Sequence, residues 1–189
     1  MYRINKPKIE KFAEIAKLGE ILFHTKDLAN LWRIKNENTL YTTISRYIKK
    51  KLLFKIYKGF YSIKPIEQID PFLLGSKAIH EYCYLSAETV LAQAGIIQQS
   101  INQITFIGSK RKKFKIEGNT YSVRQLKDEH LYNPAGIINK NHVNIATPNR
   151  AIADLLYFNP NAYFDGENLI NWKEVRGIQK AIGYPLTTK

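Results

Sequence analysis

Histidines and the single cysteine are the first side chains to consider for chemistry in this 189-residue sequence. The four histidines are scattered along the chain: His24, His80, His130 and His142. None belongs to the His-Glu-x-x-His pair with which a helix holds zinc. Cys83 lies three residues after His80, but a nucleophile needs an identifiable base and an orienting group. Because neither can be named, Cys83 is interpreted as a buried free thiol.

The acidic residues also form no recognisable site. Asp128-Glu129-His130 is typical of an exposed polar turn, and Asp154 is interpreted as a helix-surface acid or a structural hydrogen-bonding group. The sequence contains neither a Walker lysine loop nor a Gly-x-Gly-x-x-Gly motif. We therefore expect no catalytic residue, no metal ligand and no cofactor, and predict that the protein is not an enzyme.

A second group of side chains suits binding rather than catalysis. Leu40, Ile44 and Ile48 recur every four residues and predict the apolar stripe of a helix over 39–51, with Asn38 as its N-cap. The opposite side carries hydroxyl and basic side chains, and no Asp or Glu occurs between Asn38 and Lys64. Such side chains read base edges and hold phosphates, so this face is expected to bind DNA.

Neighbouring elements would position that face. The apolar spacing predicts a helix over 8–18, then a short helix that begins at the cap Thr25 and ends near Arg33. Two β-rich runs around Lys58-Gly59 predict a hairpin after the basic helix. This is the order of a winged helix-turn-helix domain, whose third helix enters the major groove. The residues predicted to contact DNA are Asn38, Thr39, Tyr41, Thr42, Ser45, Arg46, Lys49, Lys50, Lys55, Tyr57 and Lys58.

The charge distribution agrees with this assignment. The chain has 29 Lys and Arg against 16 Asp and Glu, a net charge of +13. A Lys-, Ile- and Asn-rich composition of the kind that an AT-rich genome encodes would explain an excess over the whole chain. However, residues 1–65 hold 15 basic and 5 acidic side chains, a net charge of +10. A positive electrostatic field that is concentrated in one third of the chain attracts polyanions such as nucleic acid.

The two prolines Pro65 and Pro71 indicate a domain boundary. We predict an α+β protein with a winged helix-turn-helix domain over 1–65 and a small mixed α/β domain over 70–189. In the second domain the patterns predict a helix that begins after the cap Ser86, strands over 104–107, 136–138 and 143–145, a hairpin joining 114–116 to 120–123, and helices over 149–158 and 171–182.

A basic run lies between two predicted strands of the second domain: Lys110, Arg111, Lys112 and Lys113. It is interpreted as a surface loop. Two explanations remain open for it, a solvated charge run or a second contact with nucleic acid or with an acidic partner.

No apolar run approaches the roughly 18–20 residues that span a bilayer, and no apolar segment follows the basic start as in a secretory signal. We expect a cytoplasmic protein with no membrane partner.

Several motifs together resemble the AbiEi-like antitoxins, a bacterial family from type IV toxin–antitoxin systems of abortive infection. The segment 58–65, KGFYSIKP, resembles the wing of that family and the chain that leaves it. The segment 84–91, YLSAETVL, closed by Gly95-Ile96-Ile97, is similar to its next helix. The segment 146–157, ATPNRAIADLLY, resembles its Ala-Thr-Pro-Glu-Lys helix, with Asn149 and Arg150 in place of Glu and Lys.

The resemblance implies a transcriptional regulator that represses its own operon at inverted repeats in its promoter and counteracts a nucleotidyltransferase-type toxin. Two alternatives stay open. The chain could be a nuclease that its winged helix positions on nucleic acid, or an adaptor whose winged helix contacts only proteins.

Overall fold

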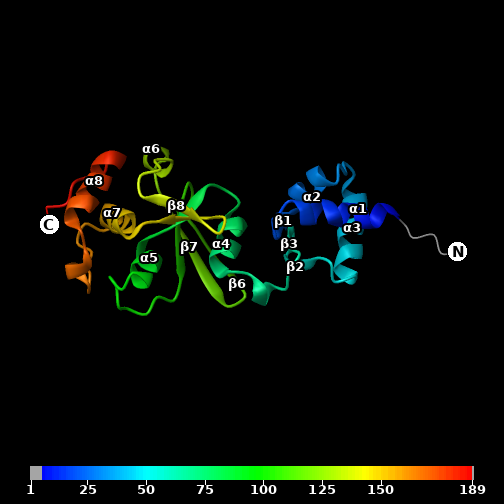
Figure 1. The fold of residues 1–189 in the computed structure, drawn as a ribbon, viewed down its shortest axis with the longest axis horizontal. Coiled ribbons are helices and arrows are strands. Elements are labelled where there is room, and N and C mark those ends of the chain that lie inside the picture. Colours follow the sequence, from blue (N-terminus) through cyan, green and yellow to red (C-terminus); the bar gives the residue numbers. More distant parts are fainter. Residues whose placement is uncertain (1–5, 189) are drawn as a thin grey trace. The chain divides into compact units, whose positions relative to one another are not determined.

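The computed structural model describes residues 6–188, with side chains from residue 11 onward, and divides into two compact units, Met1–Ile69 and Asp70–Lys189. Both units mix helices and strands (Figure 1). The protein is therefore of mixed α/β class. None of the helices in the described range is long and apolar enough to cross a membrane.

The first unit contains three α-helices and a small sheet among its described residues. Its elements are α1 (Lys6–Lys17), β1 (Leu22–His24), α2 (Thr25–Leu31), α3 (Glu37–Lys49), β2 (Phe54–Tyr57), β3 (Phe60–Ser62) and the 3-10 turn η1 (Ile66–Gln68). The strands form an antiparallel sheet in the order β1-β3-β2. The predicted hairpin is confirmed, and Gly59 at its turn has a φ of 92°, which suits glycine.

Strand β1 was not predicted from the sequence, which indicated only the two helices on either side of it, over 8–18 and from Thr25 to near Arg33. Three residues are too short to show an alternating pattern, and β1 is held by pairing with β3, from which it is far in sequence. Phe23 of β1 joins the core of the unit, where the rings of Trp32 and Tyr47 stack with centroids 5.3 Å apart. Tyr47 thus widens the apolar side of α3 beyond the predicted stripe.

The second unit is built on a six-stranded sheet in the order β6-β7-β5-β4-β9-β8. The pairs β4–β9 and β5–β7 are parallel, and the other neighbours are antiparallel. The strands are β4 (Cys83–Leu85), β5 (Ile104–Gly108), β6 (Lys112–Ile116), β7 (Asn119–Gln125), β8 (Ile137–Lys140) and β9 (Val143–Ala146). All the predicted strands of this unit are present, with ends shifted by one to two residues.

Helices cover both faces of this sheet (Figure 1). They are α4 (Pro71–Ile79), α5 (Ala87–Gln93), α6 (Asp128–Leu131), α7 (Pro148–Phe158) and α8 (Trp172–Ile182), with the 3-10 turn η2 (Glu167–Leu169). Helix α4 lies on one face, and α5 and α7 on the other. Helix α4, which was not predicted, begins directly at Pro71, where Asp70 caps it by accepting hydrogen bonds from the amides of Phe72 and Leu73. Pro71, one of the two prolines that indicated the domain boundary, is therefore also the first residue of α4.

Candidate nucleic-acid interface

Helix α3 separates its apolar and polar sides sharply. Leu40, Ile44 and Tyr47 are buried in the core of the first unit. The helix begins two residues earlier than predicted: its N-cap is Asn36, whose side chain accepts a hydrogen bond from the amide of Thr39 at 3.0 Å. The expectation that Asn38 is the cap is therefore wrong, and Asn38 instead lies exposed in the first turn. The asparagine two residues earlier reaches the free amides of that turn.

All eleven residues predicted to contact DNA are exposed to solvent in the structure. Eight of them lie on or beside α3 and three on the hairpin: Asn38, Thr39, Tyr41, Thr42, Ser45, Arg46, Lys49 and Lys50, then Lys55, Tyr57 and Lys58. Arg46 and Lys49 are in the last turn of the helix. The exposed side of α3 is thus rich in hydroxyl and cationic groups, while its other side holds the helix in place.

The hairpin is tied to the start of α2. The amide of Thr25 donates a hydrogen bond of 2.9 Å to the carbonyl of Gly59 at the hairpin turn, and its hydroxyl donates another at 3.3 Å. Thr25 was predicted as the cap of α2, but the N-cap is His24, whose amide donates to the carboxylate of Asp27 at 2.7 Å. Thr25 is the first helical residue and holds Gly59, so the turn of the hairpin is fixed beside Lys58.

The basic run 110–113 is not a loop throughout, as was expected. Lys112 and Lys113 belong to strand β6 and only Lys110 and Arg111 precede it. The ammonium of Lys110 lies 2.6 Å from a carboxylate oxygen of Glu81, and hydrogen bonds from Lys110 and Ser109 lower the pKa of that carboxyl. Lys110 is therefore already paired. The two explanations for the run, a solvated charge run or a second contact with nucleic acid or with an acidic partner, now concern Arg111, Lys112 and Lys113.

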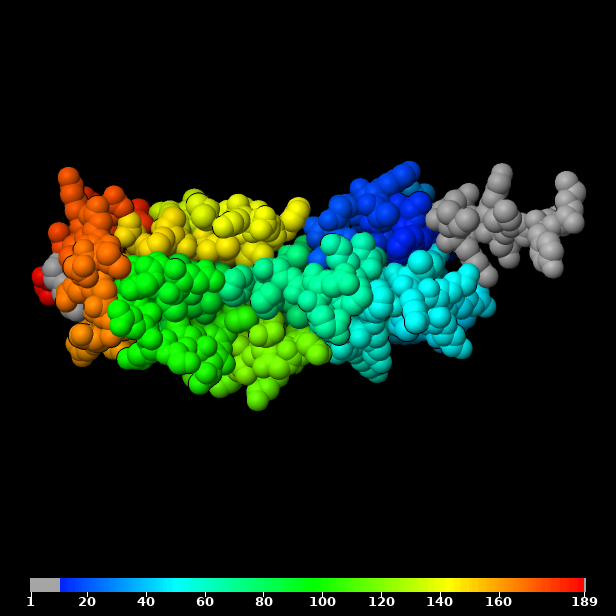
Figure 2. Space-filling view, turned by 60° about the horizontal axis from the view of Figure 1, so that its bottom comes forward, coloured from blue at the N-terminus to red at the C-terminus, as the bar shows by residue number. Residues whose placement is uncertain are grey.

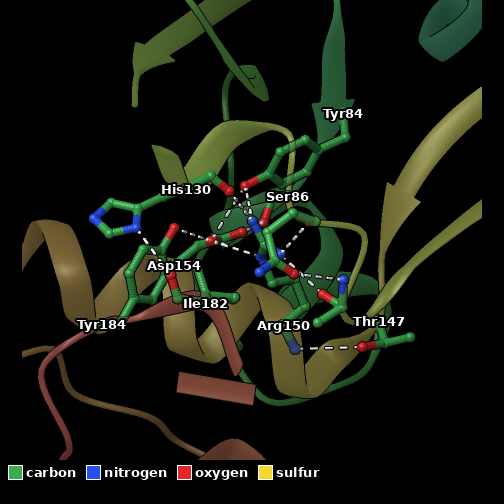
Figure 3. A network of polar contacts seen from close by, with 10 residues as sticks. Tyr84, Ser86, His130, Thr147, Arg150, Asp154, Ile182 and Tyr184 are labelled. Atoms are coloured by element: carbon green, nitrogen blue, oxygen red, sulfur yellow. Dashed lines mark hydrogen bonds and ion pairs between the residues drawn. The ribbon is translucent and has the colours of Figure 1, made fainter. Parts of the chain in front are cut away.

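A polar network lies in the interior of the second unit (Figure 3). Arg150 and Asp154, one turn apart on α7, are both fully buried, and Nε of Arg150 donates to Oδ1 of Asp154 at 2.9 Å. Other N–H groups of Arg150 donate to the hydroxyl of Tyr84 at 2.7 Å and to the carbonyl of Ala135 at 2.9 Å. The hydroxyl of Ser86 donates to Oδ2 of Asp154 at 2.7 Å. The network therefore joins α7 to β4 and to the chain that precedes β8.

Asp154 accepts a further hydrogen bond, at 2.9 Å, from the hydroxyl of Tyr184. Burial raises the pKa of Asp154, whereas the charge of Arg150 and the hydrogen bond from Ser86 act in the opposite direction. Both carboxylate oxygens are engaged by protein groups, so Asp154 is a structural hydrogen-bonding group. The other interpretation of Asp154, a helix-surface acid, is wrong, since the helix is covered on that side by the strands and by the chain after α8.

The remaining candidates for chemistry are accounted for by packing. Cys83 is a buried free cysteine, and burial raises the pKa of its thiol to about 11. His130 is in α6, where its ring lies edge-on to the rings of Tyr157 and Tyr184. No group of three or more His, Cys, Asp or Glu placed to hold a metal ion occurs among the residues that the structure describes.

Comparisons with known proteins bear on the fold. No protein-family model matches this chain, and no curated protein matches it. Among solved structures, the crystal structure of the RV2827C protein from Mycobacterium tuberculosis is similar, with a TM-score of 0.54 over 98% of this chain and 74% of that one. Its sequence is 11% identical, so the likeness concerns the fold alone.

Proposed function

We propose that the first unit is a winged helix-turn-helix domain that binds double-stranded DNA. In this proposal α2, the turn after it and α3 are the helix-turn-helix, α3 enters the major groove, and the β2–β3 hairpin is the wing that lies on the phosphate backbone. The observation that carries the proposal is the joint exposure of the hydroxyl and basic side chains on α3 and the hairpin, opposite a buried apolar side.

Electrostatics supports the same assignment. The printed sequence has no acidic side chain between Asn38 and Lys64, a stretch that includes nearly all of α3 and the whole hairpin. An ordinary solvated helix intersperses Glu with Lys, and each acid beside a phosphate would repel it. A surface with cations alone gains affinity from every phosphate that it neutralises.

We further propose that the protein is the antitoxin and autorepressor of a bacterial type IV toxin–antitoxin system, with a nucleotidyltransferase-type toxin as its functional partner and the cytoplasm as its compartment. This part rests on the resemblance of segments 58–65, 84–91 and 146–157 to the AbiEi-like antitoxins. Co-expression with a nucleotidyltransferase encoded beside its gene tests it. Restored growth supports the antitoxin role, and growth arrest that the protein does not relieve contradicts it.

DNA binding is tested with the full-length protein and a labelled duplex from its own promoter, followed by fluorescence anisotropy over a series of salt concentrations. We expect the logarithm of the affinity to fall steeply and linearly with the logarithm of the salt concentration. A duplex of the same length and shuffled sequence should bind more weakly by a factor of about 10³ or more. Equal binding of both duplexes, or no binding at low salt, contradicts the repressor role.

A further inference from the structure

A groove of about 610 Å³ lies in the second unit, on the face of the sheet that α5 and α7 cover. Strands β6 and β7 form one side of it, and the segment 99–103 and the chain around the end of α7 form the others. Figure 2 shows that the β6–β7 hairpin and the segment after α5 lie side by side at the surface. The volume is within the range of about 300–1,000 Å³ that is usual for ligand sites.

Two lysines of β6 line this groove. Lys113 and Lys115 are two positions apart and pair with Ser122 and Thr120 of β7, so their side chains share one face of the strand. Both are exposed, and neither forms an ion pair with another residue of the described chain. Two unpaired lysines whose Cα atoms are about 7 Å apart along a strand suit the phosphates of a flexible polyanion.

The other walls offer groups that recognise bases. Tyr163 lines the groove and is 72% exposed as a residue, which leaves a ring face free for stacking. Gln99, Asn102 and Gln103 also line it, and their amides present both donors and acceptors to a base edge. Phosphate-binding and base-binding groups thus face the same hollow.

A carboxylate in the groove has an unused acceptor. Glu88 of α5 is among the lining residues, and its Oε1 pairs with Arg124 of β7. Its Oε2 is buried and has no hydrogen-bond partner within the described residues. An unsatisfied buried oxygen is costly. Because Oε2 is shielded from solvent, a ligand in the groove does not contact it, and Glu88 contributes to the wall of the groove only.

The groove is also longer than a single nucleotide requires, because a second hollow adjoins it. A second hollow of about 280 Å³ shares Ile101, Asn102, Gln103 and Thr120 with it, and extends to the turn of the β6–β7 hairpin at Gly118. Two hollows that share one wall favour a strand over a single small molecule.

We propose that this groove binds single-stranded nucleic acid, with phosphates on Lys113 and Lys115 and a base stacked on Tyr163. The site is separate from α3, so it does not depend on the proposed binding of duplex DNA. RNA and DNA share this chemistry, and the test uses both.

The test measures the anisotropy of short labelled oligo(A), oligo(C) and oligo(U), as RNA and as DNA, with the full-length protein. Lys113→Ala/Lys115→Ala is expected to weaken binding by about tenfold or more, and Tyr163→Ala by about tenfold. Lys140→Ala/Lys173→Ala removes the same charge from exposed positions that do not line the groove and should have little effect. Melting followed by circular dichroism checks that each variant folds.

Four outcomes decide the proposal. Loss in the groove variants, with promoter-duplex affinity retained, supports it, and the tighter of the RNA and DNA series identifies the strand. Absence of salt-dependent binding to any oligonucleotide overturns it. Equal effects of the groove pair and the control pair also overturn it, as does loss of single-strand binding in Arg46→Ala/Lys49→Ala.

Discussion

Arg150 and Asp154 form a fully buried ion pair within a single turn of α7, with Nε and Oδ1 2.9 Å apart. The guanidinium also serves as a donor to Tyr84 and to backbone carbonyls, and the carboxylate accepts from Ser86 and Tyr184. One ion pair thus connects α7, β4 and the chain after α8. Such a pair keeps the second unit in one arrangement only while both members are present.

Arg150→Met should therefore be strongly destabilising. Removing the cation leaves the buried carboxylate of Asp154 uncompensated, at a cost of about 3–5 kcal/mol in the free energy of unfolding. Urea denaturation followed by circular dichroism measures it, with Lys173→Met on the surface of α8 as the control. The double variant Arg150→Met/Asp154→Leu should be less destabilised than the sum of the two single variants. Simple additivity of the two changes would contradict the coupling.

Gly75 and Gly177 provide a matched pair of helical glycines. A Cβ at Gly75 of α4 would lie 2.4 Å from a ring carbon of Tyr121, whose ring is buried in the sheet, so Gly75→Ala should destabilise the protein by about 1–3 kcal/mol. A Cβ at Gly177 of α8 meets nothing within 4 Å, and Gly177→Ala should stabilise by about 0.4–1 kcal/mol. Thermal melting of both variants gives the comparison, and equal shifts would contradict the close contact of α4 with the sheet.

Arg46→Ala should separate base reading from phosphate binding on α3. If Arg46 contacts a base edge, its loss costs about 1–3 kcal/mol for the promoter duplex and less for a shuffled duplex. Lys49→Ala should weaken both duplexes similarly and lower the salt slope by about 1. Titrations by anisotropy measure both quantities, with Lys140→Ala as the control in the other unit. Identical behaviour of Arg46→Ala and Lys49→Ala would assign Arg46 to the phosphates instead.

The thiol of Cys83 should make stability depend on alkaline pH. Burial raises its pKa in the folded state to about 11, from an ordinary value of 9.0, so the folded state favours the neutral thiol. The resulting stabilisation is fully present below pH 9 and is lost as the pH rises through about 11, a change of about 3 kcal/mol in the free energy of unfolding.

Denaturant unfolding of the wild type and of Cys83→Ala at several values between pH 8 and pH 11 measures this dependence. The alanine variant lacks the titrating group, so its stability should fall less over that range, while the tyrosines contribute equally to both proteins. Parallel pH profiles would show that Cys83 does not contribute. Slow reaction of the native thiol with a disulfide reagent at neutral pH is an independent sign of the same burial.

Local sequence patterns predicted the helices and hairpins that are specified by residues close together in the chain. The four-residue spacing of Leu40, Ile44 and Ile48 predicted the orientation of α3, and the Lys58-Gly59 and Gly118-Asn119 pairs predicted two hairpins that the structure contains. The helix predicted over 149–158 is α7, which begins at Pro148, and the Thr147 side chain caps it by accepting a hydrogen bond from the amide of Arg150. These features follow from helix periodicity, capping and turn geometry, which depend on adjacent residues.

The sequence by itself therefore determined the amphipathic faces and turns, including a basic surface over 38–64 that carries no acidic side chain. Only the tertiary structure decided which short segments become strands and which polar side chains are buried. Strand β1 exists because β3 pairs with it, and Lys112 and Lys113 are in a strand because β7 pairs with β6. Asp154 is buried because partners distant in the sequence, Ser86 and Tyr184, meet it around α7. Pairing and burial of this kind depend on contacts between remote residues, which no local pattern encodes.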